Sequence, residues 1–336
     1  MDTLTHIVLG ACIGEVIAGK QLGKKALLLG AIAQNIPDID FVASFWLPVS
    51  ADLLAHRGFT HSILFALIVS PLLAFCTNKL FTKAGMTFSN WLSFWILQIF
   101  VHIFIDAFNA YGTGWFEPFS HYRVSFNTMF VADPLFSIWP AIALIFLLIL
   151  NVKNKKRIIL SLSALIISTL YLLIGVTNKV EINSFVDSDL KNAHIQAKRV
   201  LTTPTPLNNL LWYVIAKTDS GYYIGYRSIF DRSASMNVRY VNRNEDLFRS
   251  NANITDARRL LRFSEGYYTL DKWHDTLVFN DLRFGEIRGW ETTYPKFVCH
   301  YFLQYPDDNA LVVQRGRFSG WNLQAVTSFF NRIRGN

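Results

Sequence analysis

His102 and Asp106 stand four residues apart inside a strongly apolar stretch of the chain. On an α-helix this spacing places both side chains on one face, about one turn apart, where both can bind a single metal ion. Burying such an ionisable pair costs several kcal/mol unless it is paired or coordinated. The pair is therefore a candidate metal site. The alternative is a hydrogen-bonded polar pair that joins two helices.

Asp38 and Asp40 follow Pro37, which should end the preceding helix. In an extended stretch, residues two apart point to the same side, so both carboxylates could face one ion. Alone, this pattern is more often a helix cap or a loop.

His56 and His61 lie five residues apart around Gly58 and enter an apolar segment that Thr60 could cap. Two surface histidines are the weaker interpretation. His6, taken alone, is more typical of a hydrogen-bonded core histidine. The candidate metal ligands are His6, Asp38, Asp40, His56, His61, His102 and Asp106. This set of histidines and carboxylates, without a thiolate, suits zinc or manganese, as one or two ions.

The composition indicates an integral membrane protein with a soluble part. The chain has 336 residues, of which 51% are hydrophobic and 15% aromatic, more than in an ordinary soluble enzyme. The net charge of +8 could suggest a nucleic-acid partner, but membrane topology explains much of it. The three cysteines have no C-x-x-C spacing, which argues against a disulfide framework or a cysteine zinc site.

Six apolar helices are expected, and the first is a retained helix rather than a cleaved signal peptide. They cover residues 1–19, 22–36, 61–76, 88–108, 134–152 and 158–176. Glu15, in the first helix, should pair with Lys20 or Lys24, and the weaker interpretation gives it a role in the site. Small residues on that helix, such as Gly10 and Gly14, suit close packing.

Basic residues fall in three alternate loops, which predicts that these loops are cytoplasmic. The clusters are Lys20/Lys24/Lys25, Lys79/Lys83 and Lys153/Lys155/Lys156/Arg157. With this topology, all seven candidate ligands reach the outer membrane face. Metal sites in helix bundles are built in this way, from side chains on several helices.

The chain resembles the YdjM-like family of membrane-bound metal-dependent hydrolases over roughly residues 1–176. The resemblance rests on Thr5-His6, Pro37-Asp38-Ile-Asp40, His56-Arg-Gly-Phe-Thr-His61-Ser62, His102-x-x-x-Asp106, Tyr111-Gly-Thr113 and Asp133-Pro134. It implies a hydrolase of the bacterial inner membrane.

A more distant likeness is to zinc-dependent phospholipase C. It implies that His6 joins one ion and that Asp106 bridges two. Asp38 or Asp40, with His56 or His61 and with His102, would hold the other ion. The further His and Glu of the third zinc site in those enzymes have no clear counterpart here.

The loop of residues 109–123 is rich in glycine and aromatic residues and suits a lid at the headgroup level. In one interpretation Arg123 holds a phosphate with its planar guanidinium. In the other, Arg123 pairs with an acid such as Asp133. His121 is best interpreted as an ordinary loop histidine. Asp40, Asp106 and Arg123 are the candidate catalytic residues.

Residues 177–336 predict a soluble α+β domain with mainly antiparallel strands. Strands are expected at 222–230, 276–279 and 310–313, and helices at 256–263 and 322–333. Residues 207–217 could begin a strand or a short helix. The domain either covers the membrane site as a scaffold or binds anionic headgroups.

The prediction is a membrane all-α six-helix bundle (1–176) with an extracytoplasmic α+β domain (177–336). It would hydrolyse an ester or phosphoester of a lipid-like or lipid-linked substrate at the periplasmic or extracellular face. No phosphate-binding or dinucleotide motif is present, so neither a nucleotide nor a nucleic acid is expected as a partner. The alternatives are an ion transporter and an intramembrane metallopeptidase, although H-E-x-x-H is absent.

Overall fold

The computed structural model describes residues 1–336 except 251–253, 310–311, 313–315 and 336. By its contacts the chain forms two units. The first, here called the helical unit, comprises Met1–Val42, Ala55–Ile174 and Pro206–Asn208. The second, here called the sheet unit, comprises Ala43–Leu54, Gly175–Thr205 and Asn209–Asn336. One helix, α7, runs from the first unit into the second.

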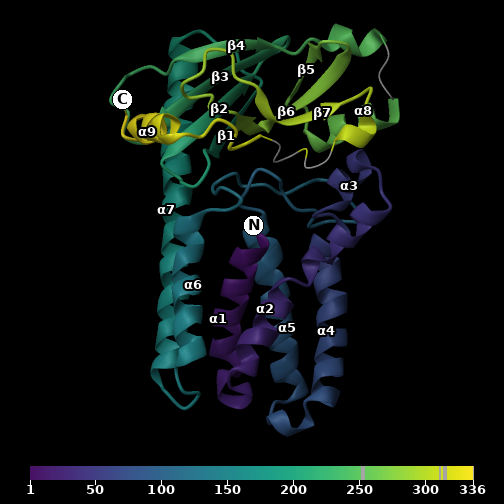
Figure 1. Ribbon diagram of the computed structural model, residues 1–336, viewed down its shortest axis with the longest axis vertical. Helices are drawn as coiled ribbons and strands as arrows, with labels where there is room; N and C mark the ends of the chain where they lie inside the picture. Colours follow the sequence, from purple (N-terminus) through teal and green to yellow (C-terminus); the bar gives the residue numbers. More distant parts are fainter. Residues whose placement is uncertain (251–253, 310–311, 313–315, 336) are drawn as a thin grey trace. The chain divides into compact units, whose positions relative to one another are not determined.

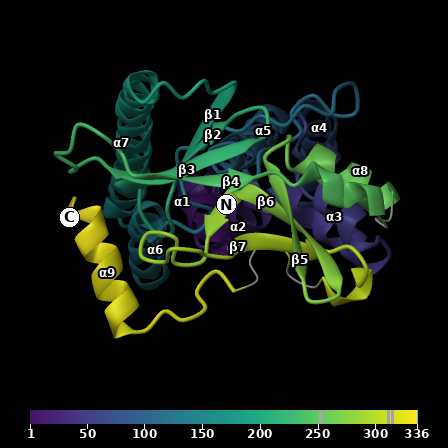
Figure 2. The same cartoon turned by 90° about the horizontal axis from the view of Figure 1, so that it is seen from above.

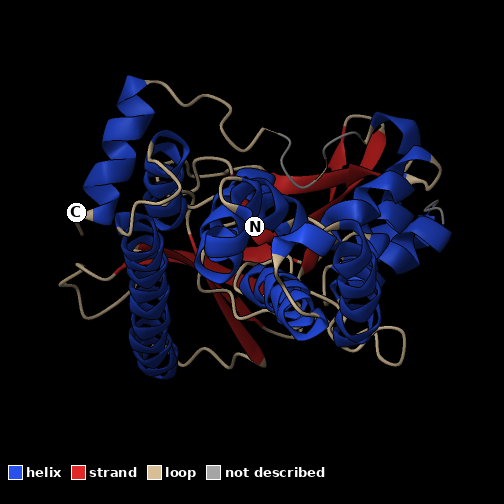
Figure 3. Cartoon of the chain, turned by 90° about the horizontal axis from the view of Figure 1, so that it is seen from below, coloured by secondary structure: helices blue, strands red, loops and turns tan. Residues whose placement is uncertain are grey.

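Apolar helices, most of them long and with roughly parallel axes, build the helical unit (Figures 1 and 3). They are α1 (Thr3–Leu22), α2 (Lys25–Gln34), α4 (Ile63–Leu80), α5 (Phe88–Asp106), α6 (Pro134–Ile149) and α7 (Lys156–Asn192). Short 3-10 helices cover Pro37–Phe45, Phe59–His61 and Thr82–Ala84. A helix therefore begins near each of the six predicted positions, and α7 continues well past Val176.

Four of these helices are long and apolar enough to cross a membrane, namely α1, α4, α5 and α7. Between α2 and the 3-10 helix Pro37–Phe45 the chain bends by 59°. These two helices together make a fifth span only if the bent pair is counted as a single membrane crossing. The remaining apolar helix, α6, has 16 residues, fewer than a full span of about 20. The structure thus supports several apolar helices but does not establish six spans.

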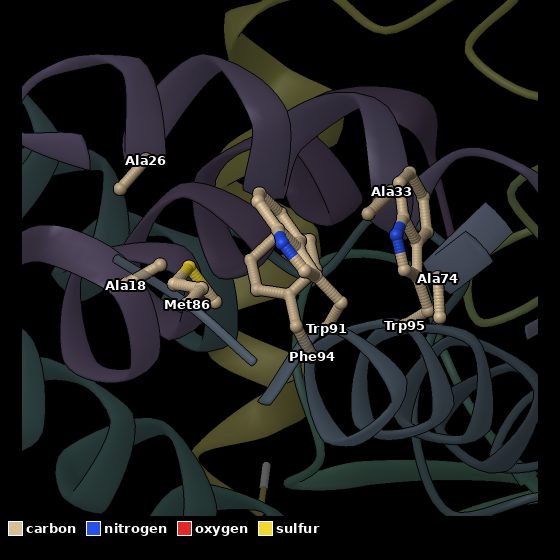
Figure 4. Packing of buried hydrophobic residues seen from close by; sticks show 8 residues of the cluster. All are labelled: Ala18, Ala26, Ala33, Ala74, Met86, Trp91, Phe94 and Trp95. Atoms are coloured by element: carbon tan, nitrogen blue, oxygen red, sulfur yellow. The ribbon is translucent and has the colours of Figure 1, made fainter. Parts of the chain in front are cut away.

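Small residues let α1 and α2 approach closely, as the sequence predicts. A Cβ atom added to Gly10 would lie 2.3 Å from the Gly30 carbonyl oxygen, and one added to Gly14 would lie 2.3 Å from that of Ala26. Neither distance is sterically possible, so glycine is required at both crossings. Beside this contact, Trp91, Phe94 and Trp95 of α5 pack against alanines of α1, α2 and α4 (Figure 4).

Two polar contacts tie α7 into the helical unit, and both differ from the pairings considered from the sequence. Glu15 pairs with Arg157, not with Lys20 or Lys24: the two oxygens of the carboxylate accept from Nε at 2.7 Å and from Nη2 at 2.6 Å. Asp133 caps α6 and accepts a hydrogen bond from the Tyr171 hydroxyl at 2.8 Å. Asp133 is therefore not the partner of Arg123.

Two antiparallel sheets form most of the sheet unit, seen from above in Figure 2. The first has the order β1 (Arg199–Pro204), β2 (Leu211–Lys217), β3 (Gly221–Ser228) and β4 (Val238–Asn242). The second has the order β5 (Tyr268–Trp273), β6 (Thr276–Glu286) and β7 (Phe297–Phe302). Besides the C-terminal part of α7, the helices of this unit are α3 (Val49–Ala55), α8 (Ile254–Phe263) and α9 (Leu323–Ile333), with 3-10 helices at Glu245–Ser250 and Pro306–Asp308.

The predicted antiparallel character of the C-terminal region is confirmed. Strands lie at 221–228 and 276–286, and residues 207–217 contain a strand rather than a helix. Helices occur close to both predicted positions. Most of the strand predicted at 310–313 lies outside the described residues.

Candidate metal centre

Asp38, His61, His102 and Asp106 form a cluster that could hold a metal ion. One ligand atom from each residue lies within 4.8 Å of those of all the others. Asp38 comes from the 3-10 helix that follows α2, and His61 ends the short 3-10 helix before α4. His102 and Asp106 occupy one face of α5, one turn apart, as their spacing predicts.

The imidazole Nε2 atoms of His61 and His102 lie 3.1 Å apart. Asp38 Oδ1 lies 3.5 Å from each of these nitrogens. Asp106 Oδ2 lies 3.5 Å from His61 Nε2 and 3.7 Å from His102 Nε2. Three of the four side chains are fully buried, and Asp38 is 21% exposed.

The outer nitrogens of the two rings face hydrogen-bond acceptors. His102 Nδ1 lies at hydrogen-bond distance from the backbone carbonyl of Gln34, which can only accept. His61 Nδ1 lies 3.3 Å from Asp40 Oδ2 and 3.1 Å from the Thr60 hydroxyl oxygen. These partners assign the proton of each neutral ring to Nδ1. Both Nε2 lone pairs then point into the cluster.

Asp38 and Asp40 lie in a 3-10 helix and not in the predicted extended stretch. Their carboxylates approach opposite nitrogens of the His61 ring, with Asp38 Oδ1 3.5 Å from Nε2 and Asp40 Oδ2 3.3 Å from Nδ1. The Asp40 carboxylate accepts hydrogen bonds from the loop of residues 56–61. Its carboxylate accepts from the Arg57 backbone N–H at 2.7 Å and from the Thr60 hydroxyl at 3.1 Å, and it lies 3.1 Å from His56 Nδ1. Asp40 and His56 are outside the four-residue cluster.

The sequence suggested Thr60 as the cap of the following helix, but its hydroxyl donates to Asp40 instead. Ser62 caps α4 instead, and its Oγ accepts from the Phe65 N–H at 3.0 Å. This turn fixes His61 at the buried end of the loop, while a third of the His56 side chain stays exposed.

His6 lies next to the cluster. Its Nε2 is 3.1 Å from Asp106 Oδ1, and its ring stacks on His102 with centroids 3.8 Å apart. The N-terminal amino group of Met1 also lies against Asp106 Oδ1. Of the seven predicted ligands, the structure therefore brings four into one cluster, places His6 beside it, and leaves Asp40 and His56 in a neighbouring layer.

Arg57 is a site residue that sequence reasoning missed. Its Nε lies 3.1 Å from Asp106 Oδ2, and its other nitrogens donate to Asn109 Oδ1 at 2.8 Å and to the Met1 carbonyl at 3.0 Å. Burial lowers the pKa of Arg57 below its usual value, while the carboxylates of Asp38 and Asp40 act in the opposite direction. The sequence did hold a signal for this role, since Arg57 is a charged residue between His56 and Gly58 for which no partner was expected.

Arg123 contacts the loop of residues 56–61. Its Nη2 donates to the His56 carbonyl at 2.8 Å, and its guanidinium lies 5.6 Å from the ring centroid of Tyr111. The Tyr111 ring also receives the guanidinium of Arg57, at 5.0 Å. His121 is exposed and pairs with Glu117 at 2.8 Å, in keeping with an ordinary loop histidine.

The sequence comparisons agree with the motifs on which this cluster is built. A model of the YdjM inner membrane protein family matches residues 1–182, just over half of the chain. The chain belongs to the YdjM inner membrane protein family. The match contains all four residues of the cluster and their neighbours His6, Asp40 and His56.

Two relatives extend the comparison. The uncharacterized protein YfhP of Bacillus subtilis is 29% identical over 239 residues, which cover 67% of this chain and 68% of YfhP. The inner membrane protein YbcI of Escherichia coli is 34% identical over 123 residues, which cover 36% of this chain and 69% of YbcI. No solved structure matches the chain. Family membership and the apolar helices together support an inner-membrane location.

Proposed function

We propose that this YdjM-family protein is a membrane-bound metal-dependent hydrolase. The observation that carries the proposal is the convergence of two imidazole lone pairs and two carboxylates in a buried cluster. Lone pairs 3.1 Å apart repel each other unless a cation or a proton lies between them. Asp106 Oδ2 lies 3.1 Å from Arg57 Nε but accepts no hydrogen bond of good geometry from any residue that the structure describes.

The donor set fits a divalent metal ion. Histidine nitrogens and carboxylate oxygens are zinc ligands. Manganese binds the same groups but prefers a larger share of oxygen ligands. We assign Asp38, His61, His102 and Asp106 as the residues that would hold the ion. His6, on the other side of Asp106, could serve a second one. When bound in an open site, such an ion supplies a water of lowered pKa and positive charge against a developing oxyanion.

Asp40 and the Gln34 carbonyl would act through the histidines. The Gln34 carbonyl accepts from His102 Nδ1, and Asp40 Oδ2 lies 3.3 Å from His61 Nδ1, beside the Thr60 hydroxyl at 3.1 Å. Both contacts keep an Nε2 lone pair directed at the cluster. Partners of this kind also raise the basicity of a ligand histidine. Asp40 is thus a positioning residue in this account and not one of the ligands.

The proposed substrate is an ester or phosphoester of a lipid. In support of this, the segments that carry the site also expose large apolar side chains. These are Ile39, Phe41, Phe59, Phe116, Phe119 and Tyr122. Tyrosine, here Tyr122, is enriched at the level of lipid headgroups, and the exposed phenylalanines and Ile39 offer apolar surface to acyl chains. The alternating basic loops support an outer, periplasmic position for the site.

One observation favours a second candidate, an ion transporter. Gln98 lies one turn before His102 on α5, and its Nε2 donates to the Gly10 carbonyl at 3.0 Å. The side-chain atoms of Gln34 and the Oε1 atom of Gln98 are buried without a hydrogen-bond partner among the described residues. Polar groups therefore continue beyond the cluster into the bundle, as they do along ion paths.

A hydrolysis assay on purified protein in mixed micelles tests the first candidate against the second. Phospholipids and a chromogenic phosphodiester serve as probes, with zinc or manganese supplied. We expect turnover by the wild type that His102→Ala abolishes. Metal uptake into proteoliposomes without any hydrolysis would favour the transporter.

Arg123 discriminates between substrates in the same assay. Should Arg123 bind a phosphate, Arg123→Lys keeps the charge but loses the planar fork, so KM for the phosphodiester should rise while metal content stays unchanged. A variant with wild-type kinetics would favour a carboxyl ester as the substrate.

A further inference from the structure

Arg57 is a buried cation beside the candidate metal centre, and the proposed chemistry gives it no role. Its side chain is 3% exposed, and its backbone has a φ of 58°, a left-handed conformation that glycine adopts more readily than arginine. A buried charge and an unfavourable backbone angle both cost free energy, so the contacts of this residue must offset them. Residues of this kind gather at functional sites.

Uncharged partners hold the Arg57 guanidinium in place. It donates to Asn109 Oδ1 at 2.8 Å and to the Met1 carbonyl at 3.0 Å, and it lies 5.0 Å from the centroid of the Tyr111 ring. Asn109 is fixed in turn, because its Nδ2 donates to the Asp106 carbonyl at 3.0 Å. These groups orient the guanidinium but do not balance its charge, which leaves that role to nearby carboxylates.

Asp106 is the carboxylate that pairs with this guanidinium. Arg57 Nε lies 3.1 Å from Asp106 Oδ2, yet neither atom makes a hydrogen bond of good geometry with any described residue. The two groups therefore attract each other by charge, and the lone pairs of Oδ2 are not consumed by the contact. The same oxygen lies 3.5 Å from His61 Nε2 and 3.7 Å from His102 Nε2. Asp106 can thus bind an ion in the cluster while Arg57 stays beside it.

The charges of the centre suit one divalent ion. Asp38, Asp40 and Asp106 contribute three carboxylates, and of the lysine and arginine side chains that the structure describes, Arg57 alone forms an ion pair with any of them. One divalent ion together with Arg57 would balance the charge of these three side chains. A second divalent ion would add an excess of positive charge in a buried site, where like charges repel strongly.

We propose that Arg57 takes the place of a second metal ion beside Asp106, so that the centre holds one divalent ion. On the side where a second ion would bind, Asp106 Oδ1 already faces His6 Nε2 at 3.1 Å and the Met1 amino group. The guanidinium also repels the bound ion, so Arg57 weakens the metal affinity that the ligands alone would give. This inference rests on the proposed function, because it concerns the same centre.

Zinc binding by the full-length protein in detergent tests the proposal. Elemental analysis at saturating zinc gives the stoichiometry, and competition with a chelator gives the Kd. Thermal unfolding with and without zinc gives a third readout. The test variant is Arg57→Met, which removes the charge and keeps an unbranched side chain, whereas Arg57→Lys keeps the charge. The matched control is Arg123→Met, which removes a guanidinium that also lies near the Tyr111 ring but whose Nη2 donates to the His56 carbonyl.

We expect the wild type to bind one zinc ion. Arg57→Met should bind zinc about tenfold more tightly, because a repelling charge is gone, and zinc should raise its thermal midpoint by more than that of the wild type. Arg57→Lys and Arg123→Met should keep the wild-type affinity.

Two zinc ions in the wild type, or weaker zinc binding in Arg57→Met, would overturn the proposal and leave the metal centre itself in place. The wild-type stoichiometry decides between one ion and two even should Arg57→Met fail to fold. A wild type that binds no zinc would instead overturn the metal-dependent function, and this proposal with it.

Discussion

The Nε2 atoms of His61 and His102 lie 3.1 Å apart, and each ring faces a hydrogen-bond acceptor with its opposite nitrogen. Two nitrogens bound to one tetrahedral zinc ion, with Zn–N of about 2.0–2.1 Å, would be about 3.3 Å apart. The two rings thus already stand at nearly the separation that a shared ion needs. Since α5 and the loop before α4 carry them, the site depends on tertiary packing and not on one motif.

The roles of Asp38 and Asp40 can be separated by metal affinity. Asp40 faces the Nδ1 atoms of His56 and His61, so Asp40→Asn should weaken zinc binding by roughly 10 to 100-fold while the full stoichiometry is still reached at high zinc. Asp38→Ala removes a ligand and should lower the stoichiometry itself. Isothermal titration of both variants measures this difference. A lower stoichiometry in Asp40→Asn with an intact one in Asp38→Ala would reverse the two assignments.

The buried pair of Glu15 and Arg157 should dominate the stability of the helical unit. Glu15→Gln leaves a guanidinium that is 2% exposed without its counter-charge, which costs about 3–5 kcal/mol. We expect a clear fall in the midpoint of thermal unfolding in detergent. Lys20→Gln, at an exposed position, is the control and should change stability by less than about 0.5 kcal/mol. Equal midpoints for the two variants would contradict the importance of the pair.

The stability of the sheet unit should depend on pH through Glu286. Burial raises the pKa of Glu286 to about 7 from its usual 4.5, although Arg239 and the Tyr226 hydroxyl act in the opposite direction. The folded protein therefore keeps this proton to a higher pH than the unfolded chain. The protonated Glu286 side chain contributes about 3 kcal/mol to the free energy of unfolding, and this contribution is present below pH 4.5 and is lost as the pH rises to about 7.

Glu286→Gln should remove this part of the pH dependence. Unfolding followed by tryptophan fluorescence between pH 4.5 and 8 measures it, with Asp219→Asn as the control because Asp219 is 81% exposed. A pH profile in Glu286→Gln that parallels the wild type would exclude Glu286 as its source.

The orientation in the membrane is open to a direct labelling test. Single cysteines at Lys155 and at Phe119, in a background without Cys12, Cys76 and Cys299, can be treated with a membrane-impermeant maleimide in spheroplasts. Phe119 is 84% exposed and belongs to the loop on the predicted outer side. We expect label at position 119 and protection at 155. The opposite pattern would place the site on the cytoplasmic side and remove the argument for a periplasmic substrate.

Local patterns predicted the helices and the partnership of His102 with Asp106, because one helical turn determines both. The same reasoning was wrong about the backbone at Asp38 and Asp40, since a 3-10 helix replaces the predicted extended stretch. It also failed for Glu15, because Arg157 lies 142 positions away along the chain. Contacts at such separation depend on how helices pack, and charge patterns in one short segment favour the nearest lysine instead.

The central claim, that His61 and His102 share a metal ion with Asp38 and Asp106, is tested most directly by elemental analysis of purified protein. We expect the wild type to retain one or two equivalents of zinc or manganese after gel filtration. His102→Ala and Asp106→Ala should each retain far less, whereas His121→Ala, at an exposed loop position, should match the wild type. Full metal content in the His102→Ala and Asp106→Ala variants, or none in the wild type after zinc supplementation, would contradict the account.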